Sequence, residues 1–269
     1  MRQNLHTHCT FCDGKNTPEE LVREAIRMEM DSLGFSSHSP LAGQEDWTMS
    51  PEEVPRFRAE ILRLREKYAG RLEIYLGLEQ DYYSPPSGKG WGYQIGSVHC
   101  VEKEGRLLPV DYLPEDLARS VRQYYGGDWY ALAEDYFALA GGVAERTGCQ
   151  IVGHFDLIAK FNEGDRLFDT SHPRYANAAL EALDRLAERE VILEINTGAM
   201  ARGYRSAPYP APWLLRAMAE RKLPICITSD CHERSNLLFA FPQAAELARS
   251  CGYRESMVLT RAGFVPEPL

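Results

Sequence analysis

The sequence predicts an α/β protein whose parallel strands form a sheet or a barrel. Short apolar or β-branched runs alternate with longer amphipathic stretches along the chain, and this βαβα order is typical of parallel strands. Seven such runs can be counted, each four to seven residues long. The length of 269 residues suits one α/β barrel of about 250 residues. We therefore expect a single domain over residues 1–269.

Each expected strand is bounded by polar or turn-forming residues, as strands usually are. In chain order the strands are expected at residues 4–7, 32–37, 72–78, 94–98, 150–153, 191–196 and 224–228.

Helix starts are marked by a capping residue followed by proline and acids. Thr17 and Pro18 precede two glutamates, and Ser50 and Pro51 repeat the arrangement. Apolar residues at three- and four-residue spacings predict further helices at 113–125, 130–147, 174–189, 211–221 and 241–251. The segments 82–93, 162–173 and 198–212 are expected to be loops, and loops of that length often carry function.

Composition limits the class of protein. A net charge of −9 repels phosphate backbones, which disfavours long nucleic acid as a partner. No apolar run approaches the roughly 18 residues of a membrane span, and no signal-peptide pattern follows the first residues. We therefore expect a cytoplasmic protein with no membrane association, whose oligomeric state the sequence does not define. Seven scattered cysteines favour free thiols, and the single Cys-x-x-Cys, Cys9 and Cys12, is weak evidence for zinc or redox chemistry.

Six of the seven histidines lie at or just after the ends of expected strands. They are His6, His8, His38, His99, His154 and His232. In a barrel, the carboxyl ends of the strands meet at one mouth, so these side chains are expected to meet there. An isolated His-x-His is more often two half-buried polar residues on an edge strand, but the other strand ends favour a metal site.

Carboxylates follow the same strands as the histidines. Asp13 comes shortly after the first strand, Glu79 directly follows the third, and Asp230 stands two residues before His232. Mixed imidazole and carboxylate ligands are typical of zinc, manganese and iron sites. The pattern therefore predicts a metal centre at the mouth.

Other catalytic signatures are missing from the sequence. It contains no Gly-x-Ser-x-Gly elbow and no Walker loop. The pairs Gly126-Gly127 and Gly141-Gly142 are expected in helical surroundings. His172 precedes a helix and has no neighbouring acid, so we interpret it as a surface or capping residue.

The chain resembles the polymerase-and-histidinol-phosphatase (PHP) superfamily, and within it the histidinol-phosphatase branch. The resemblance extends over nearly the full length. It rests on the segments His6-Thr7-His8, Asp13-Gly14 to Glu20, Gly34 to Pro40, Gly77-Leu78-Glu79, Ile95 to His99, Gly153 to Asp156, Glu194 to Thr197 and Ser229 to His232. Ser37 stands where aspartate is usual in the family, and Lys160 where a basic residue, often arginine, is expected.

This resemblance implies a distorted seven-stranded (β/α)7 TIM-like barrel with three divalent metal ions, zinc, iron or manganese, at its mouth. The implied ligands of the first ion are His6, His8, Glu79 and Asp230. Those of the second are Glu79, His99 and His154, and those of the third are Asp13, His38 and His232. Glu79 would bridge the first two ions. The implied catalytic centre is carried by Glu79, Asp230 and His232.

The resemblance implies a histidinol-phosphatase, which converts L-histidinol phosphate to L-histidinol and phosphate in histidine biosynthesis. We expect hydrolysis of a small phosphate monoester by metal-activated water, with Lys160, Arg202 or Arg205 binding the phosphoryl group. Asp156 is a candidate acid for the leaving oxygen by position alone. Two alternatives remain: a related phosphoesterase acting on another small ester, a nucleotide or a nucleic-acid terminus, and a non-catalytic metal-binding domain.

Overall fold

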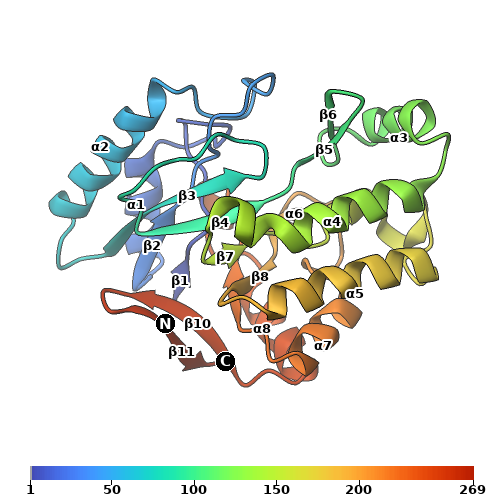
Figure 1. Ribbon diagram of the computed structural model, residues 1–269. Helices are drawn as coiled ribbons and strands as arrows, with labels where there is room; N and C mark the ends of the chain where they lie inside the picture. The colour runs from blue at the N-terminus through green and yellow to red at the C-terminus, as the bar shows by residue number, and fades with distance from the viewer. Residues whose placement is uncertain (1) are drawn as a thin grey trace.

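A seven-stranded parallel sheet forms the centre of the computed structural model, which describes residues 2–269 (Figure 1). Its strands are β1 (Gln3–Asn4), β2 (Ser32–Phe35), β3 (Glu73–Asp81), β4 (Tyr93–Ser97), β7 (Ile151–Val152), β8 (Ile192–Asn196) and β9 (Ile225–Thr228). They lie side by side in this order, and every adjacent pair is parallel. All seven expected strands are thereby confirmed, with ends shifted by up to three residues.

The two edges of the sheet meet just beyond β1 and β9, which makes the sheet a nearly closed barrel. Thr7 and Cys231 form a parallel bridge there. The amide of His8 donates to the Cys231 carbonyl at 2.8 Å, and the amide of Cys231 donates to the His6 carbonyl at 3.0 Å. We call this junction, residues 6–8 and 230–232, the seam.

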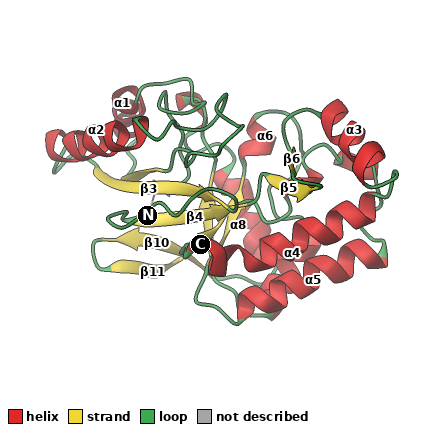
Figure 2. Ribbon diagram, turned by 45° about the horizontal axis from the view of Figure 1, so that its top comes forward, coloured by secondary structure: helices red, strands yellow, loops and turns green. Residues whose placement is uncertain are grey.

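Eight α-helices occur among residues 2–269, and most of them cover the outside of the barrel (Figure 2). They are α1 (Pro18–Arg27), α2 (Glu53–Lys67), α3 (Pro114–Tyr124), α4 (Trp129–Thr147), α5 (Pro173–Ala187), α6 (Gly198–Ala201), α7 (Pro212–Glu220) and α8 (Phe241–Ser250), with short 3-10 turns η1 (Leu157–Ala159), η2 (Glu163–Asp165) and η3 (Arg234–Asn236). Both views show α4 and α5 packed side by side.

The predicted helix starts meet different outcomes. At α1 the expected cap is confirmed, because Thr17 and Glu20 form a reciprocal capping box. At α2 the prediction is wrong, since the helix begins at Glu53 and Ser50 provides no side-chain cap. There Ser50 and Glu53 close a tight turn in which the Glu53 amide donates to the Ser50 carbonyl at 3.0 Å.

Two antiparallel hairpins were not indicated by the sequence. One joins β5 (Cys100–Lys103) to β6 (Arg106–Pro109), and the other joins β10 (Glu255–Thr260) to β11 (Gly263–Pro268). The second lies beside the chain ends in Figure 1. Gln3 anchors it to the barrel, because its side chain bonds the Leu259 carbonyl and amide, each at 2.8 Å.

Inside the barrel, a tyrosine occupies space that two glycines leave open. Tyr93 is almost fully buried and donates its hydroxyl hydrogen to the Leu5 carbonyl. A Cβ atom at Gly34 would lie 2.3 Å from the Tyr93 hydroxyl, and one at Gly77 would lie 2.2 Å from its ring. These distances are below any real contact, so side chains at both positions are excluded by packing.

Candidate metal centre

The nine expected ligand residues lie together at the carboxyl end of the barrel strands. They are His6, His8, Asp13, His38, Glu79, His99, His154, Asp230 and His232, and their donor atoms form overlapping groups. The three expected catalytic residues belong to this set. Glu79 lies within β3, and each of the others follows a barrel strand, which is the arrangement that brings distant segments to one mouth.

Four of these side chains surround a single point at the seam. His6 Nε2 lies 3.2 Å from Glu79 Oε2 and 3.6 Å from Asp230 Oδ1. His8 Nε2 lies 3.4 Å and 3.2 Å from the same two oxygens. All four residues are at least nine-tenths buried.

The other oxygen of Glu79 faces two more histidines. Its Oε1 lies 3.0 Å from His154 Nε2 and 3.4 Å from His99 Nε2. The two oxygens of one carboxylate therefore point at two separate groups of imidazoles. This is the geometry of a carboxylate that bridges two metal ions.

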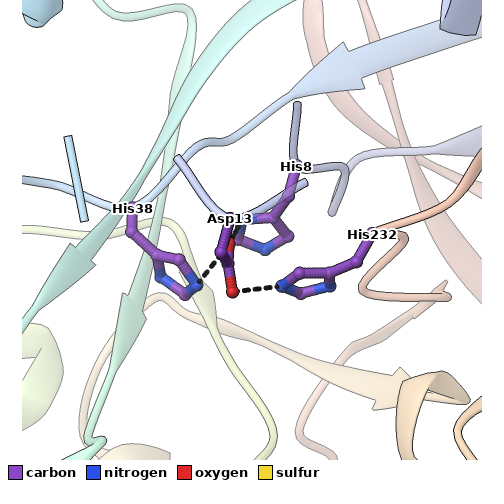
Figure 3. A group of neighbouring side chains, drawn as sticks. All are labelled: His8, Asp13, His38 and His232. Carbon is purple, nitrogen blue, oxygen red and sulfur yellow. Dashed lines mark ion pairs between the residues drawn. The ribbon is translucent and has the colours of Figure 1, made fainter. Parts of the chain in front are cut away.

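A third group lies closer to solvent (Figure 3). Asp13 Oδ2 is 3.1 Å from His232 Nε2, and Asp13 Oδ1 is 3.7 Å from His38 Nε2 and 3.9 Å from His8 Nδ1. Figure 3 shows the three imidazoles arranged around the Asp13 carboxylate. His38 also contacts Glu79 through its Nδ1, at 2.8 Å, so the third group adjoins the first.

The donor atoms of this cluster fit metal ions. Among residues 2–269, His6 Nε2, His8 Nε2 and Glu79 Oε2 are buried and make no hydrogen bond. Leaving such atoms unpaired is costly, and a cation shared among them removes that cost. Imidazole nitrogens mixed with carboxylate oxygens suit zinc, iron or manganese.

Electrostatics keeps the buried carboxylates of the cluster ionised. Burial raises the pKa of Glu79, but the histidines around it outweigh burial and hold that pKa well below its usual range. For Asp230 the adjacent Arg202 makes the largest opposing contribution. Burial, with His232 and His38 nearby, lowers the pKa of His8 to about 3. Ionised acids and a neutral imidazole are the forms that bind metals.

Two carboxylates that the sequence analysis did not assign to the site contact the imidazole nitrogens that face away from the cluster centre. Glu194 Oε2 lies 2.9 Å from His6 Nδ1, and Asp81 Oδ2 lies 3.1 Å from His99 Nδ1. Such contacts fix the tautomer and leave Nε2 free for a metal. A signal for Glu194 was present, because a carboxylate within the apolar run 191–196 needs a buried partner.

The backbone at Asp230 is unusual. Its φ angle is +45°, in the left-handed region that residues other than glycine rarely adopt. β9 ends at Thr228, so Asp230 and His232 follow the strand and do not lie within it. Instead they flank Cys231, whose bridge to Thr7 aligns them with His6 and His8.

A pocket of about 420 Å³ opens over the cluster. It is lined by Asp13, Lys15, His38, Asp46, Trp47, His99, Pro109, Asp111, Tyr112, His154, Leu157, Lys160, Arg202, Asp230 and His232. This volume is in the range of about 300–1,000 Å³ typical of small-molecule sites.

Two of the three expected phosphate-binding cations line this pocket. Arg202 Nη2 donates to Asp230 Oδ2 at 2.9 Å, so its guanidinium lies directly against the cluster. Lys160 Nζ donates to the Asp111 carbonyl at 2.6 Å.

Arg205 and Asp156 lie elsewhere, in a neighbouring cavity of about 260 Å³. Arg205 donates to the Ala159 carbonyl at 3.0 Å. Asp156 accepts from the Ala211 amide at 3.0 Å, and burial raises its pKa. Neither residue lines the pocket over the cluster.

The remaining expectations concern residues outside the cluster. His172 caps α5, accepting from the Arg174 amide at 3.2 Å, as expected. Gly141 and Gly142 lie within α4, and Gly126 and Gly127 form the turn between α3 and α4, so both pairs lie in helical surroundings, as expected. All seven cysteines are free thiols. No helix among residues 2–269 is both long and apolar enough to cross a bilayer.

Comparisons with known proteins place the chain among sequences and structures of one family. The PHP domain model matches residues 4–198. A Deinococcus radiodurans protein named "Probable histidinol-phosphatase" is 34% identical over 93% of both chains. The histidinol-phosphatase of Bacillus subtilis is 25% identical, covering 90% of this chain and 97% of its own. A solved structure of histidinol phosphate phosphatase from Lactococcus lactis, complexed with zinc, L-histidinol and phosphate, is 19% identical, with a TM-score of 0.68 over 98% of each chain.

Proposed function

The chain belongs to the PHP domain family, and from this premise we propose that it is a histidinol-phosphatase, a metal-dependent phosphoric monoester hydrolase. It would convert L-histidinol phosphate and water to L-histidinol and phosphate, a step of histidine biosynthesis. The observation that carries the proposal is the convergence of nine imidazole and carboxylate side chains beneath a pocket that also contains Arg202. Full-length likeness to relatives with this name supports the substrate.

The proposed cofactor is a set of three divalent ions, zinc, iron or manganese. The first would be held by His6, His8, Glu79 and Asp230, the second by Glu79, His99 and His154, and the third by Asp13, His38 and His232. When bound, such ions lower the pKa of water so that it becomes nucleophilic near neutral pH, and they neutralise phosphoryl oxygens.

The protein's own side chains would position the phosphoryl group. Arg202 and Lys160 line the pocket on the solvent side of the cluster, where they can donate to phosphoryl oxygens as charge builds up on them. The contact between Arg202 and Asp230 holds the guanidinium in place before substrate arrives.

Two further proposals concern the location of the protein in the cell and its domain organisation. We place the protein in the cytoplasm, which is supported by its seven free cysteines, since free thiols are typical of a reducing compartment. We also propose that residues 1–269 form one domain. This is supported by the seam, because it joins the first barrel strand to the last.

Metal removal and return tests the proposal. The protein is stripped with a chelator and assayed for phosphate release after addition of zinc, manganese or iron(II). L-histidinol phosphate is compared with a nucleoside monophosphate and a phosphate-terminated oligonucleotide. We expect activity to depend on metal and to be highest with L-histidinol phosphate. A preference for another ester would contradict the proposed substrate. Metal binding without phosphate release would contradict the proposed enzymatic activity.

The seven histidines provide a matched pair of variants. His154→Asn removes a ligand of the proposed second ion, whereas His172→Asn changes the one histidine outside the cluster and retains a capping side chain. We expect His154→Asn to lose metal and activity and His172→Asn to keep both. Equal effects of the two variants would remove the cluster from the mechanism.

A further inference from the structure

We infer that a second cavity, next to the pocket over the cluster, binds a small zwitterion of the amino-acid type, which carries an ammonium and a carboxylate on one carbon. This cavity has a volume of about 260 Å³ and is lined by the segments 162–173 and 198–212 and by residues on either side of them. The groups that carry the inference are Asp156, Tyr175 and Arg205. None of them lines the pocket over the cluster, so the inference goes beyond the proposed phosphatase function.

Three buried polar atoms of these residues have no hydrogen-bond partner. Among residues 2–269, Asp156 Oδ1, Tyr175 Oη and Arg205 Nε are buried and unpaired, and all three residues line the cavity. Asp156 and Tyr175 are at most 1% exposed. Because an unpaired donor or acceptor away from water is costly, we expect a bound molecule to supply the missing partners.

The same three side chains are held in place by their other contacts. Asp156 Oδ2 accepts from the Ala211 amide at 3.0 Å, and Arg205 Nη1 donates to the Ala159 carbonyl at 3.0 Å. The ring of Tyr175 is packed in the hydrophobic core. A ligand would therefore meet groups that are already in position, which reduces the entropy lost on binding.

Asp156 and Arg205 carry opposite charges but do not pair with each other. No ion pair joins them in the part of the chain that the structure describes. Arg205 Nε lies 3.8 Å from Glu163 Oε2, which is too far for a hydrogen bond, and the other carboxylate oxygen of Glu163 accepts from the Ser206 amide at 3.3 Å. The cavity thus presents one acidic and one basic group, each with an unused hydrogen-bonding atom.

This pair of charges favours a ligand that carries both signs. A metal ion would be repelled by Arg205, and an inorganic anion would be repelled by Asp156. A zwitterion can place its ammonium against the carboxylate and its own carboxylate against the guanidinium, with the Tyr175 hydroxyl as a further donor. Hydrogen bonds between charged groups are roughly twice as strong as those between neutral groups.

The remaining walls of the cavity suit a short apolar side chain. Ala159, Pro212 and Trp213 contribute apolar surface, and the Trp213 ring centroid lies 6.5 Å from that of Tyr175. The lining residue Gly164 is exposed, so the cavity opens to solvent there. Its volume lies just below the range of about 300–1,000 Å³ typical of drug-sized ligands, which limits the ligand to a single amino acid or a molecule of that size.

The test compares zwitterions with molecules that lack one of the two charges. L-alanine and L-valine are the zwitterions. Ethylamine and isobutylamine are the same molecules without the carboxylate, and propionate and 3-methylbutanoate are the same molecules without the ammonium. Titration calorimetry on the metal-loaded protein measures each Kd, and the comparison on the wild type needs no variant.

Two pairs of variants separate this cavity from other sites. Arg205→Ala removes the guanidinium from the cavity, whereas Arg202→Ala removes the same charge three residues away, in the pocket over the cluster. Tyr175→Phe removes the unpaired hydroxyl. Its control, Tyr136→Phe, changes an equally buried tyrosine whose hydroxyl donates to the Phe155 carbonyl at 3.2 Å.

We expect at least one of the two amino acids to bind, and its two singly charged forms to bind about ten- to a hundredfold more weakly. Arg205→Ala should weaken amino-acid binding by a similar factor and Tyr175→Phe by about two- to tenfold, while both controls keep the wild-type Kd. Absence of binding by both amino acids would leave the cavity to water and overturn the inference. Equal binding of a singly charged form, an unchanged Kd in Arg205→Ala, or an equal loss in Arg202→Ala would overturn it as well.

Discussion

Replacing Glu194 with glutamine should force His6 into the wrong tautomer. Glu194 Oε1 accepts from the His154 amide at 2.6 Å and from Asn196 Nδ2 at 2.7 Å. Both are obligatory donors, so the oxygen of a glutamine must take this position. Its NH₂ group then occupies the position of Oε2, opposite His6.

The displaced hydrogen bond has a direct consequence for metal binding. In the wild type, His6 Nδ1 lies 2.9 Å from Glu194 Oε2 and can donate to it. Opposite an NH₂ group, Nδ1 must accept, so the proton moves to Nε2, which faces Glu79 and Asp230. A protonated nitrogen cannot bind a metal ion.

The expected magnitude follows from comparable metal sites. Loss of such an orienting partner costs about 10–100-fold in metal affinity, or about 1.4–2.7 kcal/mol for one ion. Competition with a chelator measures the affinity of the first ion, and circular dichroism confirms that the variant is folded. Asp81→Asn, which changes the partner of His99, should weaken a different ion. A folded Glu194→Gln protein with wild-type affinity for every ion would refute the reasoning.

Three further outcomes are expected. Arg202→Ala should raise KM clearly while changing the metal content of the protein little. Arg205→Ala should leave KM unchanged because Arg205 lies outside the pocket. Steady-state kinetics on both variants checks the contrast. Gly77→Ala should destabilise the fold by about 1–3 kcal/mol in urea unfolding, because its methyl group would overlap the Tyr93 ring. Glu19→Gln should cost below about 1 kcal/mol at pH 7. Hydrogen bonds from Lys67 and other side chains hold the pKa of Glu19 below its usual range. The stabilisation is therefore present above the ordinary glutamate pKa and is lost as pH falls further. Urea unfolding of the wild type and the variant should show a smaller difference in the free energy of unfolding at pH 3 than at pH 7.

The strand pattern and the positions of the histidines could be predicted from the sequence because both depend on which residues follow one another within a short stretch of the chain. A short apolar run followed by His38 or His154 indicates a strand end, and parallel strands place such ends together. The structure brings all nine expected ligands into one cluster, although their roles remain predictions.

Features that depend on side-chain direction could not be predicted in this way. Arg202 and Arg205 are three residues apart in one loop, yet only Arg202 lines the pocket. Asp156 follows a ligand histidine by two residues but turns into a different cavity. The hairpins β5–β6 and β10–β11 were missed because their strands are only partly buried, so their apolar residues do not alternate clearly with polar ones.

Metal ions bound at the seam would also have a mechanical effect, besides their proposed chemical role. Residues 7 and 231 meet through one bridge, and tying together ends so far apart in sequence costs about 5 kcal/mol of chain entropy. Expected ligands lie on both sides of that bridge, with His6 and His8 on one side and Asp230 on the other. A cation bound by residues on both sides would join the first barrel strand to the last and so hold the barrel closed. The loaded protein should therefore resist proteases near its first and last barrel strands, and the stripped protein should be cut there first.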